Sequence, residues 1–142
     1  MTEGANPPAI IVHSLAQALV AAEAAVALGR PLTLRSPAGA GGTLGVGWFA
    51  GLSTLLAERH PALDLTLVLD CADEAGTALG ALRRGLKAVR VEATSDVRAK
   101  LAALAQTHGA RLDEDDRPCL DLVDGLVEPV DLAARCRDWL MH

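Results

Sequence analysis

The sequence predicts an α/β protein built on a parallel sheet. Short, continuous apolar runs alternate with helical segments about every 25 residues along the 142-residue chain, and parallel neighbours need such crossovers. The continuous runs are typical of strands that are buried on both faces. Apolar residues make up 51% of the chain and charged residues 22%, which excludes extensive disorder. We therefore expect a single domain over residues 1–142.

Each element follows from its own pattern and from the residues that flank it. Two prolines end a flexible lead-in over residues 1–8. Strands are predicted at 9–13, 32–35, 65–69 and 87–91, with a weak fifth strand near 119–123. Helices are predicted at 14–28, 48–60, 73–85 and 95–107. An acidic, irregular segment spans 112–127, and a last helix over 128–141 has proline at its first position.

The first helix has the clearest boundary signals. Ser14 with Gln17 three residues later forms a capping-box pair, which satisfies free N–H groups at a helix start. Gly29 and Pro31 follow the last apolar position and end the helix. In the same way Pro61 and Gly109 lie just beyond the second and fourth predicted helices.

Two architectures fit this alternation of strands and helices. One is an open, doubly wound (flavodoxin-like) sheet of about five strands. The other is half of a (βα)8 barrel, whose full form needs roughly 250 residues. A half-barrel leaves two open sheet edges and an apolar flank. Three arrangements would resolve this: two chains close one barrel, the sheet opens into a doubly wound layer, or the C-terminal helix covers the gap. We favour the second or the third for each protomer. A homodimer is expected, with its contact on the last helix and the sheet edge.

Composition excludes several partners and compartments. The net charge of −5 repels nucleic acid, and aromatic residues, at 2%, are too few to stack bases. The most apolar stretch, 15–28, contains Gln17 and Glu23 and is too short to span a membrane. Three cysteines without a C-x-x-C spacing predict neither disulfides nor structural zinc. The first residues lack the basic region of a signal peptide, so we expect a cytoplasmic protein.

Polar residues follow four of the predicted strands. In both architectures the carboxyl ends of parallel strands meet at one rim, where ligands bind. The residues at these ends are His13, Ser36, Asp70 with Cys71, and Glu92. Two interpretations stay open. These residues form a ligand site at the rim, or they cap the helices that follow, as polar residues at strand ends also do.

A glycine-rich loop over residues 37–47 follows the second strand. Its backbone N–H groups, at Gly39, Gly41 and Gly42 among others, would suit an anion, with Arg35 or Ser36 as the side-chain partner. No Lys-Ser/Thr pair follows, so the loop is not a P-loop. The alternative interpretation is a mobile loop over the end of the sheet.

Between residues 9 and 111 the chain resembles the N-terminal half of class II fructose-bisphosphate or tagatose-bisphosphate aldolases. The resemblance covers about 100 of the 142 residues. The similar segments, in order, are Ser14–Gln17, Pro31–Ser36, Gly45–Gly47, Leu67–Cys71 and Gly85–Glu92. It implies a barrel-half architecture and an acid–base position at Asp70.

The departures from this family bear on activity. The family's third strand ends in Asp-His-Gly, where the aspartate does acid–base work and the histidine binds the catalytic zinc. Here Asp70 matches, but Cys71 and Ala72 replace the other two residues. The remaining zinc histidines of the family lie beyond the segment of resemblance, and catalytic zinc needs three protein ligands. We therefore expect no metal, no cofactor and no aldolase activity from this chain alone.

The sequence leaves three hypotheses for function. The first is a protein that binds a small anionic metabolite or a protein partner at the strand carboxyl ends. The second is a lyase or hydrolase with Asp70 as general acid/base, assisted by Cys71, His13 or Glu92, and with a metal if an oligomer completes its site. Cys71 could act as a nucleophile with His13 only if the first and third strands are neighbours. The third is a structural or assembly role.

Overall fold

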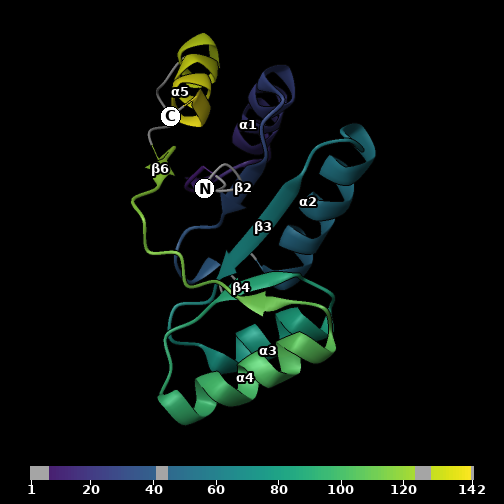
Figure 1. The fold of residues 1–142 in the computed structure, drawn as a ribbon, viewed down its shortest axis with the longest axis vertical. Coiled ribbons are helices and arrows are strands. Elements are labelled where there is room, and N and C mark those ends of the chain that lie inside the picture. The colour runs from purple at the N-terminus through teal and green to yellow at the C-terminus, as the bar shows by residue number, and fades with distance from the viewer. Residues whose placement is uncertain (1–6, 41–44, 124–128, 142) are drawn as a thin grey trace, which may run out of the picture.

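The computed structural model describes residues 7–40, 45–123 and 129–141, and it shows an α/β fold with one all-parallel sheet (Figure 1). The strands, in chain order, are β1 (Ile10–Ile11), β2 (Leu32–Arg35), β3 (Leu65–Asp70), β4 (Ala88–Arg90), β5 (Arg111–Leu112) and β6 (Leu120–Asp121). The helices are α1 (Leu15–Leu28), α2 (Val46–Arg59), α3 (Ala75–Arg83), α4 (Ser95–Thr107) and α5 (Pro129–Met141). The predicted α/β class and C-terminal helix are confirmed.

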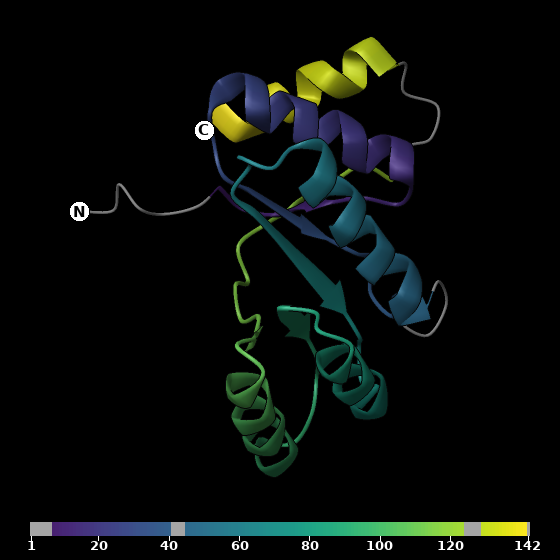
Figure 2. The ribbon, with the colours of Figure 1, turned by 90° about the vertical axis from the view of Figure 1, so that its right-hand side faces the viewer.

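The strand order distinguishes the two architectures left open by the sequence. The order across the sheet is β5-β4-β3-β2-β1-β6, so β1 to β5 follow one another as they do in the chain. A flavodoxin-like sheet would place β1 between β2 and β3. Right-handed crossovers between consecutive strands put their helices on the same face, and α1 to α4 lie along one side of the sheet (Figure 2). Successive strands of a (βα)8 barrel are likewise neighbours, with their helices on one side.

The sixth strand departs from consecutive order. After β5 the chain runs back across the sheet, and β6 pairs with β1 at the opposite edge (Figure 2). The amide of Leu122 donates to the carbonyl of Ile11 at 3.0 Å. Helix α5 then packs beside α1, and the indole of Trp139 donates to the carbonyl of Pro8 at 2.9 Å. The C-terminal helix thus covers the flank next to β1.

The start of α1 confirms its predicted cap. The Ser14 hydroxyl accepts the amide of Gln17 at 3.2 Å, and Gly29 ends the helix with a left-handed φ of 64°. The hydrogen bonds of Gln17 differ from those of a standard capping box. Its side chain accepts a hydrogen bond from the amide of His13 and donates one to the carbonyl of Leu122. This buried amide therefore links the carboxyl ends of β1 and β6.

Alternation along the strands separates two faces of the sheet. Leu67, Leu69 and Val89 point into the core between the sheet and its helices. Val68 and Ala88 are also buried, but they lie on the opposite face and outside that core. We call this opposite face, which carries Arg35, Asp70 and Arg90 by alternation, the open face of the sheet.

The aliphatic core relies on alanine where elements approach closely. Helix α1 buries four fully inaccessible alanines, at positions 18, 21, 22 and 25. Small side chains let α1 lie against both the sheet and α5. No helix within the described ranges is both long and apolar enough to cross a bilayer.

We predict that α5 is required for the stability of the domain. Leu140 is fully buried in the core, so Leu140→Ala should lower the free energy of unfolding by roughly 2–4 kcal/mol. Its neighbour Met141 is 62% exposed, and Met141→Ala should change it by less than about 0.5 kcal/mol. Denaturant unfolding of both variants tests this, and equal effects would contradict it.

Candidate functional site

The carboxyl ends of β2, β3 and β4 bring charged side chains together on the open face. In the register, Asp70 lies beside Arg90, while Arg35 lies beside Val68. Because residues two apart on a strand share a face, Arg35 and Arg90 stand on either side of β3. Two arginines on non-adjacent strands therefore border the same surface.

A single buried carboxylate joins these arginines. Asp113, just after β5, is 5% exposed. Its Oδ2 accepts from Arg90 at 3.0 Å and from Arg35 at 3.4 Å, and its Oδ1 accepts from Arg111 at 3.4 Å. We call Asp113 with these three arginines the arginine clamp. Removing water from a carboxylate is costly, and the surrounding guanidinium groups offset that cost.

The clamp holds the acidic segment 113–117 across the open face. The carbonyl of Asp115 accepts from both Arg35 and Arg90 at 3.0 Å, and Arg90 also pairs with Asp116. A hydrogen-bonded pair with Arg117 lowers the pKa of Asp115 to about 2. Since the folded pKa lies below the ordinary value, this pair stabilises the fold above about pH 4 and is lost as the pH falls toward 2. The segment is anchored by side chains rather than by a sheet ladder.

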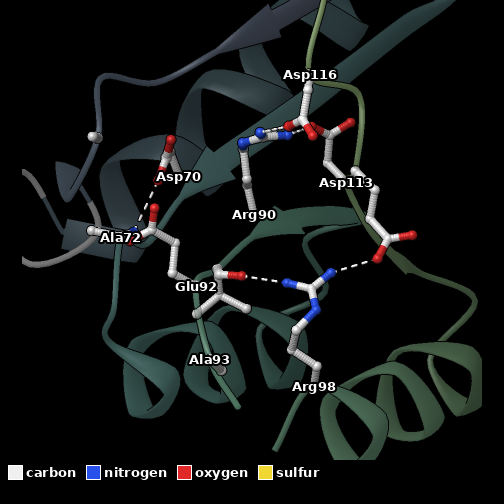
Figure 3. Close-up of a pocket in the computed structure, with 11 residues that line it drawn as sticks. Asp70, Ala72, Arg90, Glu92, Ala93, Arg98, Asp113 and Asp116 are labelled. Carbon is white, nitrogen blue, oxygen red and sulfur yellow. Dashed lines mark hydrogen bonds and ion pairs between the residues drawn. The ribbon is translucent and has the colours of Figure 1, made fainter. Parts of the chain in front are cut away.

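A cavity of about 540 Å³ opens beside this segment (Figure 3). Its wall combines residues after β3 and β4 with the acidic segment and with Arg98 of α4. The charged residues that line it are Asp70, Arg90, Glu92, Arg98, Asp113, Glu114 and Asp116. Five carboxylates therefore face two guanidinium groups. Both arginines already pair with acidic residues, Arg90 with Asp113 and Asp116, and Arg98 with Glu114.

The floor of this cavity is a tight turn after β3. Oδ1 of Asp70 accepts the amide of Ala72 at 2.9 Å, and the carbonyl of Ala72 accepts the amide of Glu92 at 2.7 Å. Ala72 has a φ of +52°, which favours glycine. The turn presents Asp70 and Glu92 to the same cavity (Figure 3).

The side chains of Arg35 and Ser36 both interact with other residues of the chain. Arg35 belongs to the clamp, and Ser36 is buried. The Ser36 hydroxyl donates to the carbonyl of Pro37 and accepts the amide of Asp70 at 2.9 Å. The Ser36 hydroxyl is therefore engaged within the chain, whereas the Nε of Arg35 is buried without a hydrogen-bond partner among the described residues. The anion contact predicted for these two side chains stays a prediction.

Of the predicted glycine loop, Gly39 is described, and Gly41 and Gly42 lie outside the described residues. Gly39 has a φ of +75°, and its amide donates to the carbonyl of Asp70 at 2.9 Å. This amide is used to fix the end of β3. The predicted anion contact at the loop stays a prediction for the rest of its glycines.

His13 and Cys71 are placed apart. β2 separates β1 from β3, so the neighbouring strands that a Cys71–His13 pair requires are not present. His13 instead pairs with Asp121 of β6 at 2.6 Å. Cys71 lies in the core, where burial, and then Asp70 and Glu74, raise the pKa of its thiol to about 12. A thiol with this pKa stays protonated at neutral pH and packs as a small apolar group.

His13, Cys71 and Glu92 are side chains of metal-ligating types, and the structure does not bring these three together as one site. In the part of the chain that the structure describes, no three histidine, cysteine or acidic side chains come together as metal ligands would. Among the predicted site residues that the structure describes, Asp70 and Glu92 are the two that line the cavity.

The arginine clamp and Arg98 were not predicted from the sequence. Alternation over 87–91 placed Arg90 on the less buried side of its strand, which was a usable signal. Asp113 lies within a run of four acidic residues, and nothing in that run distinguishes the buried carboxylate from its exposed neighbours. Comparison with known protein families and with curated proteins finds no match for this chain.

We predict that Asp113 contributes more to stability than any other carboxylate of the segment. Asp113→Asn removes the charge that three arginines share and leaves Arg35 buried, so unfolding should become easier by about 3 kcal/mol. Asp115→Asn, at a more exposed pair, should cost less than about 1 kcal/mol. Urea denaturation measures the free energy of unfolding of both variants. Losses of the same size would show that Asp113 contributes no more to stability than Asp115.

A second prediction concerns the turn at Ala72. Ala72→Gly relieves a left-handed conformation but increases the entropy of the unfolded chain, so stability should stay equal or rise by up to about 1 kcal/mol. Ala102→Gly, on the exposed face of α4, should instead destabilise by about 1 kcal/mol. Thermal and urea unfolding measure both changes. A loss at Ala72 as large as that at Ala102 would argue against strain in the turn.

Proposed function

We propose that this protein binds a small polar molecule in the cavity at the carboxyl ends of β3 and β4. The observation that supports it is the convergence of the Asp70 and Glu92 carboxylates on one cavity of about 540 Å³. Cavities of several hundred Å³ accommodate metabolites, and parallel sheets bind their ligands at this end. The strained turn that presents Asp70 is also typical of functional sites.

The charges of the cavity indicate the class of ligand. Its carboxylates outnumber its guanidinium groups five to two, and both guanidinium groups are paired. Glu92 is exposed, and its carboxylate has no hydrogen-bond or ion-pair partner among the described residues. Carboxylates accept hydrogen bonds from hydroxyl and ammonium groups. We therefore favour a neutral polyhydroxyl or a cationic amine ligand over the anionic metabolite predicted from sequence.

We expect a polyol or a diamine to raise the melting temperature of the protein. A thermal-shift panel would compare ribitol, glucose and putrescine with citrate and inorganic phosphate. Asp70→Asn combined with Glu92→Gln should abolish the response, because it removes both acceptor charges from the cavity. Asp64→Asn, an exposed carboxylate at another cavity, is the matched control and should respond like the native chain. Stabilisation by citrate or phosphate alone, or by no compound, would contradict the proposal.

A second candidate is acid–base catalysis at Asp70, in a lyase or hydrolase. One oxygen of Asp70 is held by the Ala72 amide, which leaves the other to exchange a proton with a molecule in the cavity. In that case Asp70→Asn would abolish turnover of a bound compound while Glu92→Gln mainly weakens its binding. Product analysis by mass spectrometry after incubation separates catalysis from binding.

We further propose that the protein is a cytoplasmic homodimer. All three cysteines are free thiols, which suits a reducing compartment. The sheet of the described residues ends at β5 on one side and at β6 on the other, and an edge strand is a template for a strand of another copy. Cell fractionation tests the location. Light scattering after gel filtration tests the oligomeric state, and a mass of 14.7 kDa instead of twice that value would contradict the homodimer.

A further inference from the structure

A second cavity lies at the amino ends of β2 and β3, at the opposite end of these strands from Asp70. It has a volume of about 650 Å³, which is within the range of small-molecule sites. Two loops form it, one from α1 to β2 and one from α2 to β3, and the amide of Leu32 donates to the carbonyl of Asp64 between them at 2.9 Å. Helices α1 and α2 lie on the same side of the sheet, so their last turns border the same cavity (Figure 2).

The wall of this cavity is largely apolar. A proline follows each helix end, at Pro31 and Pro61, where it stops the helix and leaves an apolar ring in the loop. Val26, which is 47% exposed, and Leu63, which also packs against the core, add branched side chains. An occupant with an apolar body would remove this surface from water, which is favourable.

Two unpaired guanidinium groups line the same cavity. Arg59 is the last residue of α2, and Arg30 follows Gly29, the residue that ends α1. The helix dipole stabilises basic side chains at helix C-termini, which accounts for their position. Both arginines are exposed, and neither guanidinium has a hydrogen-bond or ion-pair partner among the described residues. They differ in this from the two arginines of the Asp70 cavity, which are both paired.

The other polar groups of the cavity leave its lining positive. Asp64 is the one carboxylate among the described residues that line it, against two guanidinium groups. Carbonyls at helix ends would repel an anion, but the amides of Gly29 and Arg30 donate to those of α1, and the amide of His60 donates to one of α2. The Nε2 of His60 is buried without a hydrogen-bond partner among the described residues, so the wall also contains a polar atom that the chain does not satisfy. Free guanidinium donors suit a carboxylate or sulfonate group.

We propose that the amino ends of β2 and β3 form a second binding site, for a small organic anion with an apolar body. Arg30 and Arg59 bind its carboxylate or sulfonate group, and the prolines and branched side chains contact its apolar part. An inorganic anion lacks the apolar part, and a neutral apolar molecule lacks the charge. The inference does not rest on the proposed function, because the two cavities share no lining residue.

A matched set of probes tests this site by isothermal titration calorimetry. Naphthoate should bind the native chain, and its neutral analogue naphthalenemethanol and inorganic phosphate should each bind about tenfold more weakly or not at all. Arg30→Gln combined with Arg59→Gln should weaken naphthoate by about tenfold or more and leave the affinity for naphthalenemethanol unchanged.

A control variant makes the same change in net charge elsewhere. Arg83→Gln combined with Arg137→Gln removes two exposed arginines that also lack a partner among the described residues and lie outside the cavity. Arg83, like Arg59, lies in the last turn of its helix. This control should bind naphthoate within about twofold of the native chain, because distant exposed charges are screened by salt. Circular dichroism with thermal unfolding confirms that both double variants are folded.

Nuclear magnetic resonance locates the probe on the chain. In the isotopically labelled native protein, naphthoate should shift the amide resonances of residues 29–30 and 62–64 and leave those of Asp70 and Glu92 in place. Shifts at Asp70 and Glu92 instead would overturn the inference. So would the absence of naphthoate binding, equal affinities for naphthoate and naphthalenemethanol, or equal losses in the two double variants. Polyol and diamine binding at the Asp70 cavity is measured with other compounds and variants, so either proposal can fail without the other.

Discussion

The ion pairs of Asp113 determine how the chain returns across its own sheet. Arg35 and Arg90 lie on strands that β3 separates, so the carboxylate that binds both must lie over the open face. Consecutive βα units would otherwise add each new strand beside the last. By holding the segment after β5 over the open face, the clamp directs β6 to the far edge, next to β1. The packing of α5 against α1 depends on this path of the chain.

The same interaction builds the candidate site. Asp113, Glu114 and Asp116 form one wall of the cavity, and β3 and β4 supply the wall with Asp70 and Glu92. The arginines that would attract an anion are paired with that segment, so the charge left to a ligand is negative. Ala72 adds a local strain where the chain turns beneath Asp70. Structure and electrostatics therefore favour a ligand that donates hydrogen bonds.

Different elements lie at the two edges of the sheet. At β1, β6 and α5 continue the sheet and its helical layer. At β5, the last strand offers the backbone of Leu112 and a groove beside α4 with small side chains. The outermost strands, β5 and β6, each have one neighbouring strand in the sheet of the described residues.

Local patterns in the sequence determined the parallel α/β class, the helix boundaries and the position of Asp70 at a strand end. They did so because burial periodicity and capping residues such as Ser14 and Gly29 act over a few residues. The strand order, the burial of Asp113 and the placement of Cys71 away from His13 were decided by tertiary structure. β5 was also missed, since two residues carry no periodicity. These features depend on contacts between segments distant in the chain, such as Arg35 with Asp113, which no local pattern encodes.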